Sequence, residues 1–459
     1  MAKNTMRNMT EGSVARHLFF FALPMMIGGL LQQFYNMVDS MVVGNFVSDE
    51  ALAAVSAGWP IAFLYIALFM GLGTGATVVI SQYYGAGQHE RVADAVATLY
   101  TAMMVGIVPL TVIAVLLIHP MLFIMQIEES CYNETYLYLL ITCIGLVGTM
   151  GYNANAGILQ GLGDSNTSLL FLAVAAVVNV IGDLVTVLVF DMGVGGVAFA
   201  TVFAQFASWL FGIFYINRRY PQIAIRPFSG RFDRDLFQKV MKIGLPAGLQ
   251  QGIASIGFLL MMRKINSFGH VYLSAYTLGN KLDNMVWLPI QAIINACTAL
   301  VGQNVGIENY DRAKRGIRVA TLFGMSWCVI IMVFLLPLRY VGMGLFTANG
   351  EIISLGAFYL ECFFPFYPVL IYMYCVCNGM RGAGESVIPT VIMLFSHIIL
   401  RVPILYFLAD NYGPDYMYYS YAICWIIGAV ITFLYYRTGR WMRHGSMVKK
   451  NEGEAAQET

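Results

Sequence analysis

The sequence predicts an all-α polytopic membrane protein with twelve transmembrane helices. The prediction depends on the composition, the length of the apolar runs and the distribution of positive charge. Of the 459 residues, 59% are hydrophobic and only 11% are charged, and the mean hydropathy is +0.69. A soluble domain carries about 25% charged residues. Long apolar runs between short polar loops favour helices over a barrel.

The apolar runs predict the individual spans. We expect them at 17–44, 52–81, 94–118, 132–159, 167–190, 195–216, 240–265, 272–302, 316–338, 352–378, 386–409 and 417–437. The first apolar stretch extends past signal-peptide length, and no small-residue cleavage site follows it, so we interpret it as a retained first span.

Positive charge predicts the orientation. With the N-terminus inside, the inside segments are 1–16, 82–93, 160–166, 217–239, 303–315, 379–385 and the tail. Together with the adjoining helix ends they hold all but five of the 26 Lys and Arg residues, the exceptions being Arg263, Lys264, Lys281, Arg339 and Arg401. This bias is the positive-inside signal. We therefore expect a multi-pass protein of the plasma (inner) membrane with both termini cytoplasmic.

An internal repeat predicts two bundles. Residues recur at an offset of 221 in equivalent loops, where Gln82, Gly85 and Arg91 match Gln303, Gly306 and Arg312, and Gly161, Gly163 and Asp164 match Gly382, Gly384 and Glu385. We expect six-helix bundles at 1–216 and 240–437, a cytoplasmic linker at 217–239 and a cytoplasmic tail at 438–459. Six helices per half make the repeat parallel, and a central cleft between such halves suits alternating access.

Asp39 interrupts the first apolar run. A carboxylate at the centre of a spanning helix costs about 3 kcal/mol, and it normally faces a bundle interior or a water-filled cavity. Gln32, Asn36 and Asp39 share one helical face, with Tyr35 beside them. The alternative is that Asp39 caps a helix at the membrane edge.

Asp183 lies deep in the fifth apolar run, and Asn179 precedes it by one turn on the same face. An unpaired charge at this depth is costly, so we favour a functional role over a clamp that only joins helices. Neither residue has a polar counterpart in the second half, which favours a coupling site in the first half.

Neighbouring spans add oxygen ligands. Asn153 and Asn155 are in the fourth span, and Thr201 and Gln205 are one turn apart in the sixth. If these helices enclose one cavity, the oxygen-rich set suits a proton or a hard cation. Two adjacent carboxylates would also raise the pKa of one of them toward neutrality.

A polar stripe in the second half predicts residues that line the central cleft. It comprises Asn280, Asn284, Gln291 and Asn295, with Trp287 on the same face and Lys281 and Asp283 nearby. Tight helix packing through amides is the alternative interpretation. Glu361, His397 and Arg401 are further polar residues in apolar runs, and Arg401 requires a partner, for which Asp283 or Glu361 is a candidate.

Other residue types exclude several functions. The eight Cys residues do not have the spacing of a metal-binding or thioredoxin motif, so we interpret them as small apolar residues. The six His form no paired motif, which disfavours an enzyme. The sequence has no basic run with interleaved aromatic residues, a pattern that would indicate nucleic-acid binding. The many Met, Tyr and Phe residues suit a cavity for apolar cations, although most must be membrane core.

Short motifs in order along the chain resemble the multidrug and toxic compound extrusion (MATE) family of secondary transporters. They are FALPMMIGG, YNMVDSMVVGNF, LAAVSAGWP, SQYYGAGQHERV, LQGLGDSNTS, NVIGD with GVGGVAFAT, IGLPAGLQQG, LVGQNVG, MRGAGES and RVPI. The resemblance implies a V-shaped pair of six-helix bundles with a central cleft. It also implies export of cationic or amphipathic drugs or metabolites in exchange for Na⁺ or H⁺, with no enzymatic cofactor.

The resemblance also implies roles for individual residues. The coupling ion, including any Na⁺, would bind at Asp39 and Asp183 with Asn179, Asn153 or Asn155, and Thr201. The seventh span reads Gln250-Gln251 where NorM-type members have an acidic residue. This departure favours the DinF-type branch. We expect the substrate cleft to be lined by Tyr35, Asn36, Gln205, Gln250, Gln251, Asn280, Asp283, Asn284, Trp287, Gln291, Glu361 and Arg401.

Two further expectations complete the prediction. The protein should act as a monomer in the lipid bilayer, on small molecules and not on nucleic acid. The main alternative function is a flippase for a lipid-linked or amphipathic substrate of the same superfamily, which would need a cationic cavity such as Lys281, Arg263 and Arg401 could supply. A channel is disfavoured because the repeat and paired carboxylates suit coupled exchange.

Overall fold

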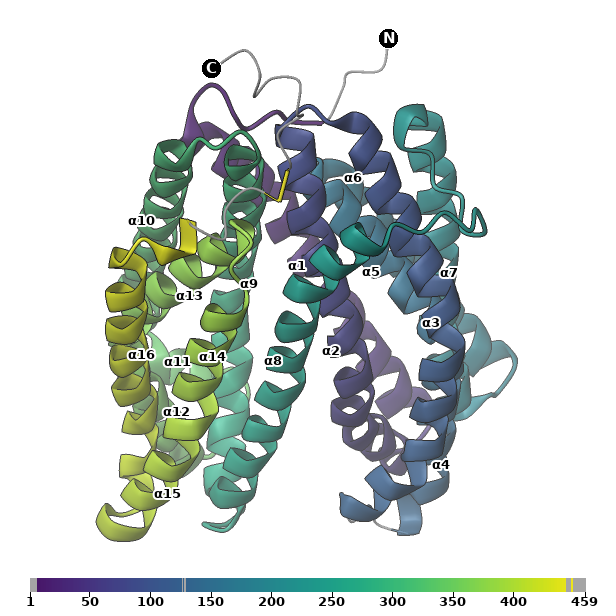
Figure 1. Ribbon diagram of the computed structural model, residues 1–459. Helices are drawn as coiled ribbons and strands as arrows, with labels where there is room; N and C mark the ends of the chain where they lie inside the picture. The colour runs from purple at the N-terminus through teal and green to yellow at the C-terminus, as the bar shows by residue number, and fades with distance from the viewer. Residues whose placement is uncertain (1–5, 126, 128, 443–446, 449–459) are drawn as a thin grey trace, which may run out of the picture. The chain divides into compact units, whose positions relative to one another are not determined.

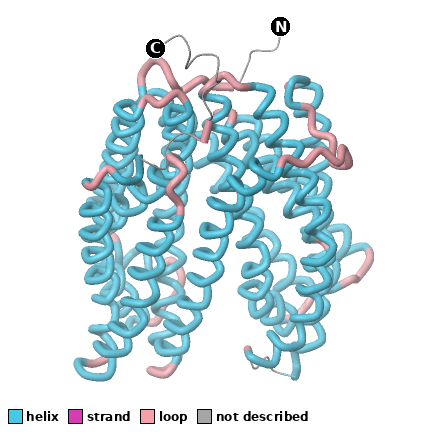
Figure 2. Tube along the Cα trace, in the orientation of Figure 1, coloured by secondary structure: helices cyan, strands magenta, loops and turns pink. Residues whose placement is uncertain are grey.

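The computed structural model describes residues 6–125, 127, 129–442 and 447–448. Within these residues every regular element is a helix and no strand occurs (Figure 2). This confirms the predicted all-α class, as expected for a chain whose backbone groups must be satisfied inside lipid.

The first half of the chain, purple to blue-green in Figure 1, comprises α1 (Val14–Phe46), α2 (Asp49–Gly85), α3 (His89–Ile124), α4 (Glu129–Ile144), α5 (Leu146–Gly161), α6 (Ser165–Leu184) and α7 (Gly193–Arg219). The second half comprises α8 (Arg234–Asn266), α9 (His270–Gly306), α10 (Tyr310–Leu335), α11 (Arg339–Gly344), α12 (Gly350–Phe363), α13 (Tyr367–Gly382), α14 (Val387–Leu394), α15 (Arg401–Tyr412) and α16 (Tyr419–Arg437). A π-helical segment, Val185–Val189, extends α6, and another, Phe395–Leu400, joins α14 to α15.

Twelve apolar segments can cross a membrane, as predicted. In the described part of the chain eleven are single spans, and the twelfth is the pair Cys131–Ile144 and Leu146–Gly161, bent by 51°. The bend falls at Gly145, where a Cβ atom would lie 2.2 Å from the Val202 side chain on α7. Glycine is therefore required for the α4–α5 junction to approach α7 this closely.

The predicted repeat is visible as matching contacts in the two halves. Thr77 on α2 donates its hydroxyl proton to the Gly157 carbonyl on α5 at 3.0 Å. In the second half, 221 residues later, Thr298 on α9 donates to the Asn378 carbonyl on α13 at 3.3 Å. The same helix pair is thus joined at the same place in each half.

Glycine contacts repeat in the same way. A Cβ atom on Gly58 would lie 2.8 Å from the Tyr138 ring, and one on Gly279 would lie 2.5 Å from the Tyr359 ring. These pairs are also 221 residues apart. Small residues at these positions let α2 and α4, and likewise α9 and α12, pack closely.

The chain forms two compact units, and two of the boundaries between them fall inside helices. Unit 1 contains Met1–Asn8, Leu23–Gly252 and Met447–Thr459, and unit 2 contains Met9–Ala22 and Ile253–Ser446. The start of α1 therefore belongs to unit 2, and the start of α8 belongs to unit 1. Pro24 in α1 and Pro246 in α8 lie close to these boundaries. The expected bundles at 1–216 and 240–437 and the linker at 217–239 stay a prediction.

Repeat-related arginines fasten the segments that lead into α1 and α8. In unit 1, the Arg91 guanidinium forms an ion pair with Asp233 at 2.9 Å, immediately before α8. In unit 2, Arg312 donates to the carbonyl oxygens of Met9, Glu11 and Gly12 at 2.7–3.1 Å, just before α1. Each arginine therefore holds the entry to the first helix of the other half of the sequence.

Repeat-related glutamines make a second matched attachment. Gln303 accepts a hydrogen bond from the backbone N–H of Met9 at 2.8 Å in unit 2. Gln82 accepts one from the backbone N–H of Met447 at 2.8 Å in unit 1. Segments outside the twelve spans thus complete each unit through the same residue type at the same repeat position.

Candidate functional site

Helices α6 and α7 are held close enough in unit 1 for their polar side chains to meet. A Cβ atom on Gly182 would lie 2.9 Å from Ala200, so glycine is needed at this crossing. One turn away from it, Asn179 Nδ2 donates to Thr201 Oγ1 at 3.3 Å. The Asn179 carbonyl oxygen is buried and has no donor among the described residues. It is therefore free to contact a further ligand.

Asp183 is fully buried one turn beyond Asn179. Neither of its carboxyl oxygens has a hydrogen-bond donor within the part of the chain that the structure describes. The helix changes to π geometry two residues later, at Val185–Val189. Such π segments often occur at functional sites. Since no described residue donates to it, this carboxyl group is available to a ligand or to a neighbouring acid.

Asp39 of α1 lies next to Asp183 of α6. The two carboxyl groups are within hydrogen-bonding reach when one of them carries a proton. When both groups are ionised they repel each other, and neither carries a proton to donate. Asp39 Oδ1 also has no donor among the described residues. The approach of the helices is set by Gly28, where a Cβ atom would lie 3.1 Å from Leu172 of α6.

Aromatic side chains surround this carboxyl pair. Tyr35 is buried one turn before Asp39 and accepts a hydrogen bond from Gln32 Nε2 at 3.4 Å. Tyr35 and Tyr138 of α4 lie close enough to Asp39 for electrostatic interaction. The backbone carbonyl of half-buried Asn36 accepts a hydrogen bond from the Ser40 hydroxyl at 3.0 Å. Asp183 is fully buried and Asp39 is half-buried, so the local dielectric is low and the electrostatic interaction between them is strong.

The remaining amides of unit 1 differ in their surroundings. Asn155 is fully buried and uses both ends of its amide, accepting from the Tyr100 hydroxyl and donating to the Trp209 carbonyl at 3.1 Å. Asn153 donates to the Thr149 carbonyl of its own helix at 2.8 Å. Gln205, one turn after Thr201, has a buried carbonyl oxygen with no donor among the described residues. The contacts of Asn155 are those of a structural residue.

This arrangement suits binding of a proton or a hard cation. Two carboxyl groups, an amide oxygen and a hydroxyl oxygen are the ligand types that hard cations prefer. A proton or a cation held between the carboxyl groups would also remove their mutual repulsion, which is large at low dielectric.

The expected cleft residues fall into both units. Tyr35, Asn36, Gln205, Gln250 and Gln251 belong to unit 1, and Asn280, Asp283, Asn284, Trp287, Gln291, Glu361 and Arg401 belong to unit 2. Within unit 2, Gln291 donates to Asn295 at 3.5 Å, a weak contact along one face of α9.

Glu361 and Asp283 have partners other than Arg401. Glu361 forms an ion pair with Arg339 at 3.0 Å, and Asp283 accepts a hydrogen bond from the Tyr367 hydroxyl. Arg401 instead lies over the ring of Tyr421, with 4.2 Å between its Cζ atom and the ring centroid. Sequence reasoning missed this aromatic surrounding because Tyr367 and Tyr421 are on different helices far along the chain.

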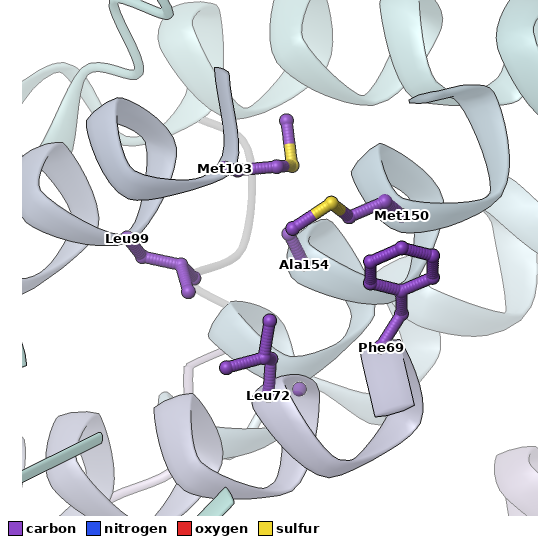
Figure 3. Close-up of a pocket in the computed structure, with 7 residues that line it drawn as sticks. Phe69, Leu72, Leu99, Met103, Met150 and Ala154 are labelled. Carbon is purple, nitrogen blue, oxygen red and sulfur yellow. The ribbon is translucent and has the colours of Figure 1, made fainter. Parts of the chain in front are cut away.

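An apolar cavity in unit 1 lies apart from these polar groups. Phe69 and Leu72 of α2, Leu99 and Met103 of α3 and Met150 of α5 line it (Figure 3). Its volume of about 10 Å³ is room for one water at most. The cavity offers no side-chain hydrogen-bond partner, so we interpret it as a packing gap between three helices.

The fold and the buried carboxyl pair define a class. A duplicated set of membrane-spanning helices with ionisable groups inside one bundle is the architecture of a polytopic secondary transporter. The model of the MatE family matches residues 24–185 and again residues 246–407, which together exceed half of the chain. The chain therefore belongs to the MatE family and is a membrane transporter, not an enzyme. The double match also supports the internal repeat.

Curated relatives cover nearly the whole chain. "Probable multidrug resistance protein YpnP" of Bacillus subtilis is 28% identical over 439 residues, spanning 94% of this chain and 97% of the relative. "Probable multidrug resistance protein NorM" of Thermotoga maritima is 22% identical and covers 98% of both chains. The "FAD transporter" of Shewanella oneidensis is 20% identical, spanning 85% of this chain and 87% of the relative.

Solved structures share the fold. A MOP superfamily transporter from Pyrococcus furiosus superimposes with a TM-score of 0.89 at 21% identity, covering 97% of this chain and 99% of its own. A MATE transporter in complex with MaL6 gives a TM-score of 0.88 at the same identity and coverage.

Proposed function

We propose that this protein is a multidrug efflux antiporter that exports organic cations or related amphipathic metabolites in exchange for Na⁺ or H⁺. The proposal is carried by one observation, the adjacency of Asp39 and Asp183 inside unit 1. Among the described residues, no hydrogen-bond donor holds the Asp183 carboxyl group. Asn179 and Thr201 supply further oxygen ligands beside them.

The coupling step follows from electrostatics. When the site is empty, two carboxylates repel across the contact between α1 and α6. Binding of H⁺ or Na⁺ removes this repulsion, so the packing of α1 on α6 differs between the loaded and the empty site. A ligand shifts a conformational equilibrium only through its different affinities for the two states. Pro24 inside α1 and the π segment after Asp183 are places where these helices can adjust.

The relatives support the substrate class. The names of YpnP and NorM describe multidrug resistance, and that of the Shewanella protein describes a metabolite with an aromatic ring system. These names favour an exporter of small molecules over the flippase that the sequence left as an alternative.

The remaining parts of the proposal come from the sequence. The distribution of Lys and Arg supports cytoplasmic termini in the plasma membrane. Gln250-Gln251 in place of an acidic residue supports the DinF-type branch, with coupling by unit 1. We also propose that the protein acts as a monomer, in which each chain carries its own carboxyl pair.

Ethidium efflux from proteoliposomes under an imposed Na⁺ or H⁺ gradient tests the function. Asp39→Asn and Asp183→Asn should each abolish gradient-driven efflux in folded protein. Asp191→Asn is the matched control, because Asp191 is exposed at a positive φ of 51° that asparagine adopts readily. Comparing the two gradients identifies the ion. Full efflux in both site variants would contradict the proposal and direct attention to Asp283.

A further inference from the structure

Arg401 is the least compensated charge in the described part of unit 2. The residue begins α15 and is only 7% exposed. Its Nε and Nη2 atoms are buried and have no hydrogen-bond partner among the described residues. These two atoms lie along one edge of the guanidinium group. That edge has the spacing that binds both oxygens of a carboxylate.

Aromatic rings cover a face of the guanidinium and leave this edge without a partner. The Cζ atom lies 4.2 Å from the Tyr421 ring centroid and 5.7 Å from that of Trp425, both on α16. The Tyr421 hydroxyl is in turn hydrogen-bonded to Tyr276 at 2.9 Å, which fixes the ring. Cation–π contacts stabilise a buried cation, but they use its face and not its N–H groups.

No acidic group of unit 2 takes up these N–H groups. Within the described residues, Arg401 is in no ion pair. Asp283 is near enough to attract it, but its carboxylate is bonded to Tyr367. His397, one turn before Arg401, points its ring nitrogens at the Met393 carbonyl and the Tyr374 hydroxyl. A buried guanidinium whose N–H groups have no acceptor is costly even with a carboxylate nearby, which calls for a ligand at this edge.

We propose that Arg401 binds a carboxylate of the transported substrate through its Nε–Nη2 edge. Trp287 and Tyr374, whose rings are 4.8 Å apart and which are only half-buried, supply an aromatic surface beside the site. The inference rests on the proposed function and extends its substrate class. It assigns this transporter aromatic substrates that carry a carboxylate, zwitterions included, in addition to simple cations.

A matched pair of dyes tests this assignment. Rhodamine 110 carries a free carboxylate, and rhodamine 123 is its methyl ester with the same aromatic cation. Calorimetric titration of the purified wild-type protein should show about tenfold or more preference for rhodamine 110, the range expected for charged hydrogen bonds. Equal affinity, or preference for the ester, would overturn the assignment without any variant.

Variants then identify the residue responsible. Arg401→Lys keeps the charge but lacks the two-nitrogen edge, so the preference should fall below about threefold. Arg401→Gln should abolish it. Arg339→Lys is the control, because Arg339 already has Glu361 as its partner and should leave the preference unchanged. A preference that persists in both Arg401 variants would place the carboxylate elsewhere.

Two further outcomes separate the alternatives. If phosphatidylglycerol added to phosphatidylcholine nanodiscs removes the preference, the edge binds an anionic lipid headgroup, and the assignment to substrate is wrong. If the preference is absent while ethidium efflux still depends on Asp39 and Asp183, this inference fails and the proposed antiport stands. Binding of neither dye, together with ethidium efflux that responds to neither gradient, would contradict both.

Discussion

Replacing Arg312 by alanine should release the segment Met9–Gly12 that leads into α1. The guanidinium donates four hydrogen bonds to three carbonyl oxygens of this segment, at 2.7–3.1 Å. A buried hydrogen bond from a charged group is worth about 1.5–3 kcal/mol. Arg312 is only half-buried and Glu11 and Gly12 are exposed, so we discount the four bonds to about 2 kcal/mol in total. Local opening should then increase about 30-fold.

Limited trypsin digestion measures this opening, because Arg7 and the exposed Arg16 flank the segment. Cleavage at these sites should accelerate by the same factor when opening and closing are fast relative to cleavage. Arg315→Ala is the control, since Arg315 is exposed on the same helix. Gln303 and Asn304 still hold Met9, so the protein should stay folded. Equal cleavage rates in both variants and the wild type would refute the reasoning.

Two predictions concern the matching attachment in unit 1. Burial raises the pKa of the Asp233 carboxyl, but backbone N–H groups of the first α8 turn and the Arg91 guanidinium outweigh it and hold the pKa below its usual value. The ionised Asp233 carboxyl therefore stabilises the start of α8 above about pH 4, and this stabilisation is lost as the pH falls through the lowered pKa. Hydrogen exchange at the start of α8 should accelerate over that pH range. Asp233→Asn should remove this pH dependence of hydrogen exchange, and an unchanged pH profile in the variant would contradict the prediction. Gly75→Ala would place a Cβ atom 2.3 Å from the Val240 carbonyl oxygen, so it should lower the free energy of unfolding by about 1–3 kcal/mol. Gly106→Ala should not, because its Cβ atom would meet only Leu110 Cδ1, at an ordinary contact distance of 4.0 Å. Equal thermal unfolding of the two glycine variants would rule out this tight contact.

Sequence reasoning could predict the fold because its signals are distributed over many residues. Twelve apolar runs predict twelve spans whichever helices pack together, and an offset of 221 is detectable before any contact is known. The attachments made by Arg91 and Arg312 to the segments before α8 and α1 were harder to predict from the sequence. Arg91 and Arg312 match in the repeat, yet nothing in their spacing shows that one binds Asp233 and the other binds backbone carbonyls.

The candidate site was predictable only in part, because adjacency depends on packing. The spacing of Asn179 and Asp183 follows from one helix, but the approach of Asp39 depends on Gly28 meeting Leu172. Asn155 looks like a ligand in the sequence, whereas its partners Tyr100 and Trp209 come from two other helices. A polar residue type at a suitable depth does not specify which neighbour satisfies it.

The environment of Arg401 was missed for the same reason. Tyr421 and Trp425 are one turn apart on one face of α16, which is a recognisable pattern for holding a cation. The sequence alone did not indicate that this face meets the start of α15. The expected partners Asp283 and Glu361 have the correct charge, but Tyr367 and Arg339 occupy them.

Coupling through the carboxyl pair can be measured by equilibrium binding of ethidium to the purified protein, titrated against H⁺ and against Na⁺. Thermodynamic linkage requires that the coupling ion weaken substrate binding if the two favour different states. The account predicts that one ion weakens ethidium binding to the wild type and to Asp191→Asn, and that this effect is absent in Asp39→Asn and Asp183→Asn. The same ion dependence in all four proteins would contradict coupling through the buried carboxyl pair.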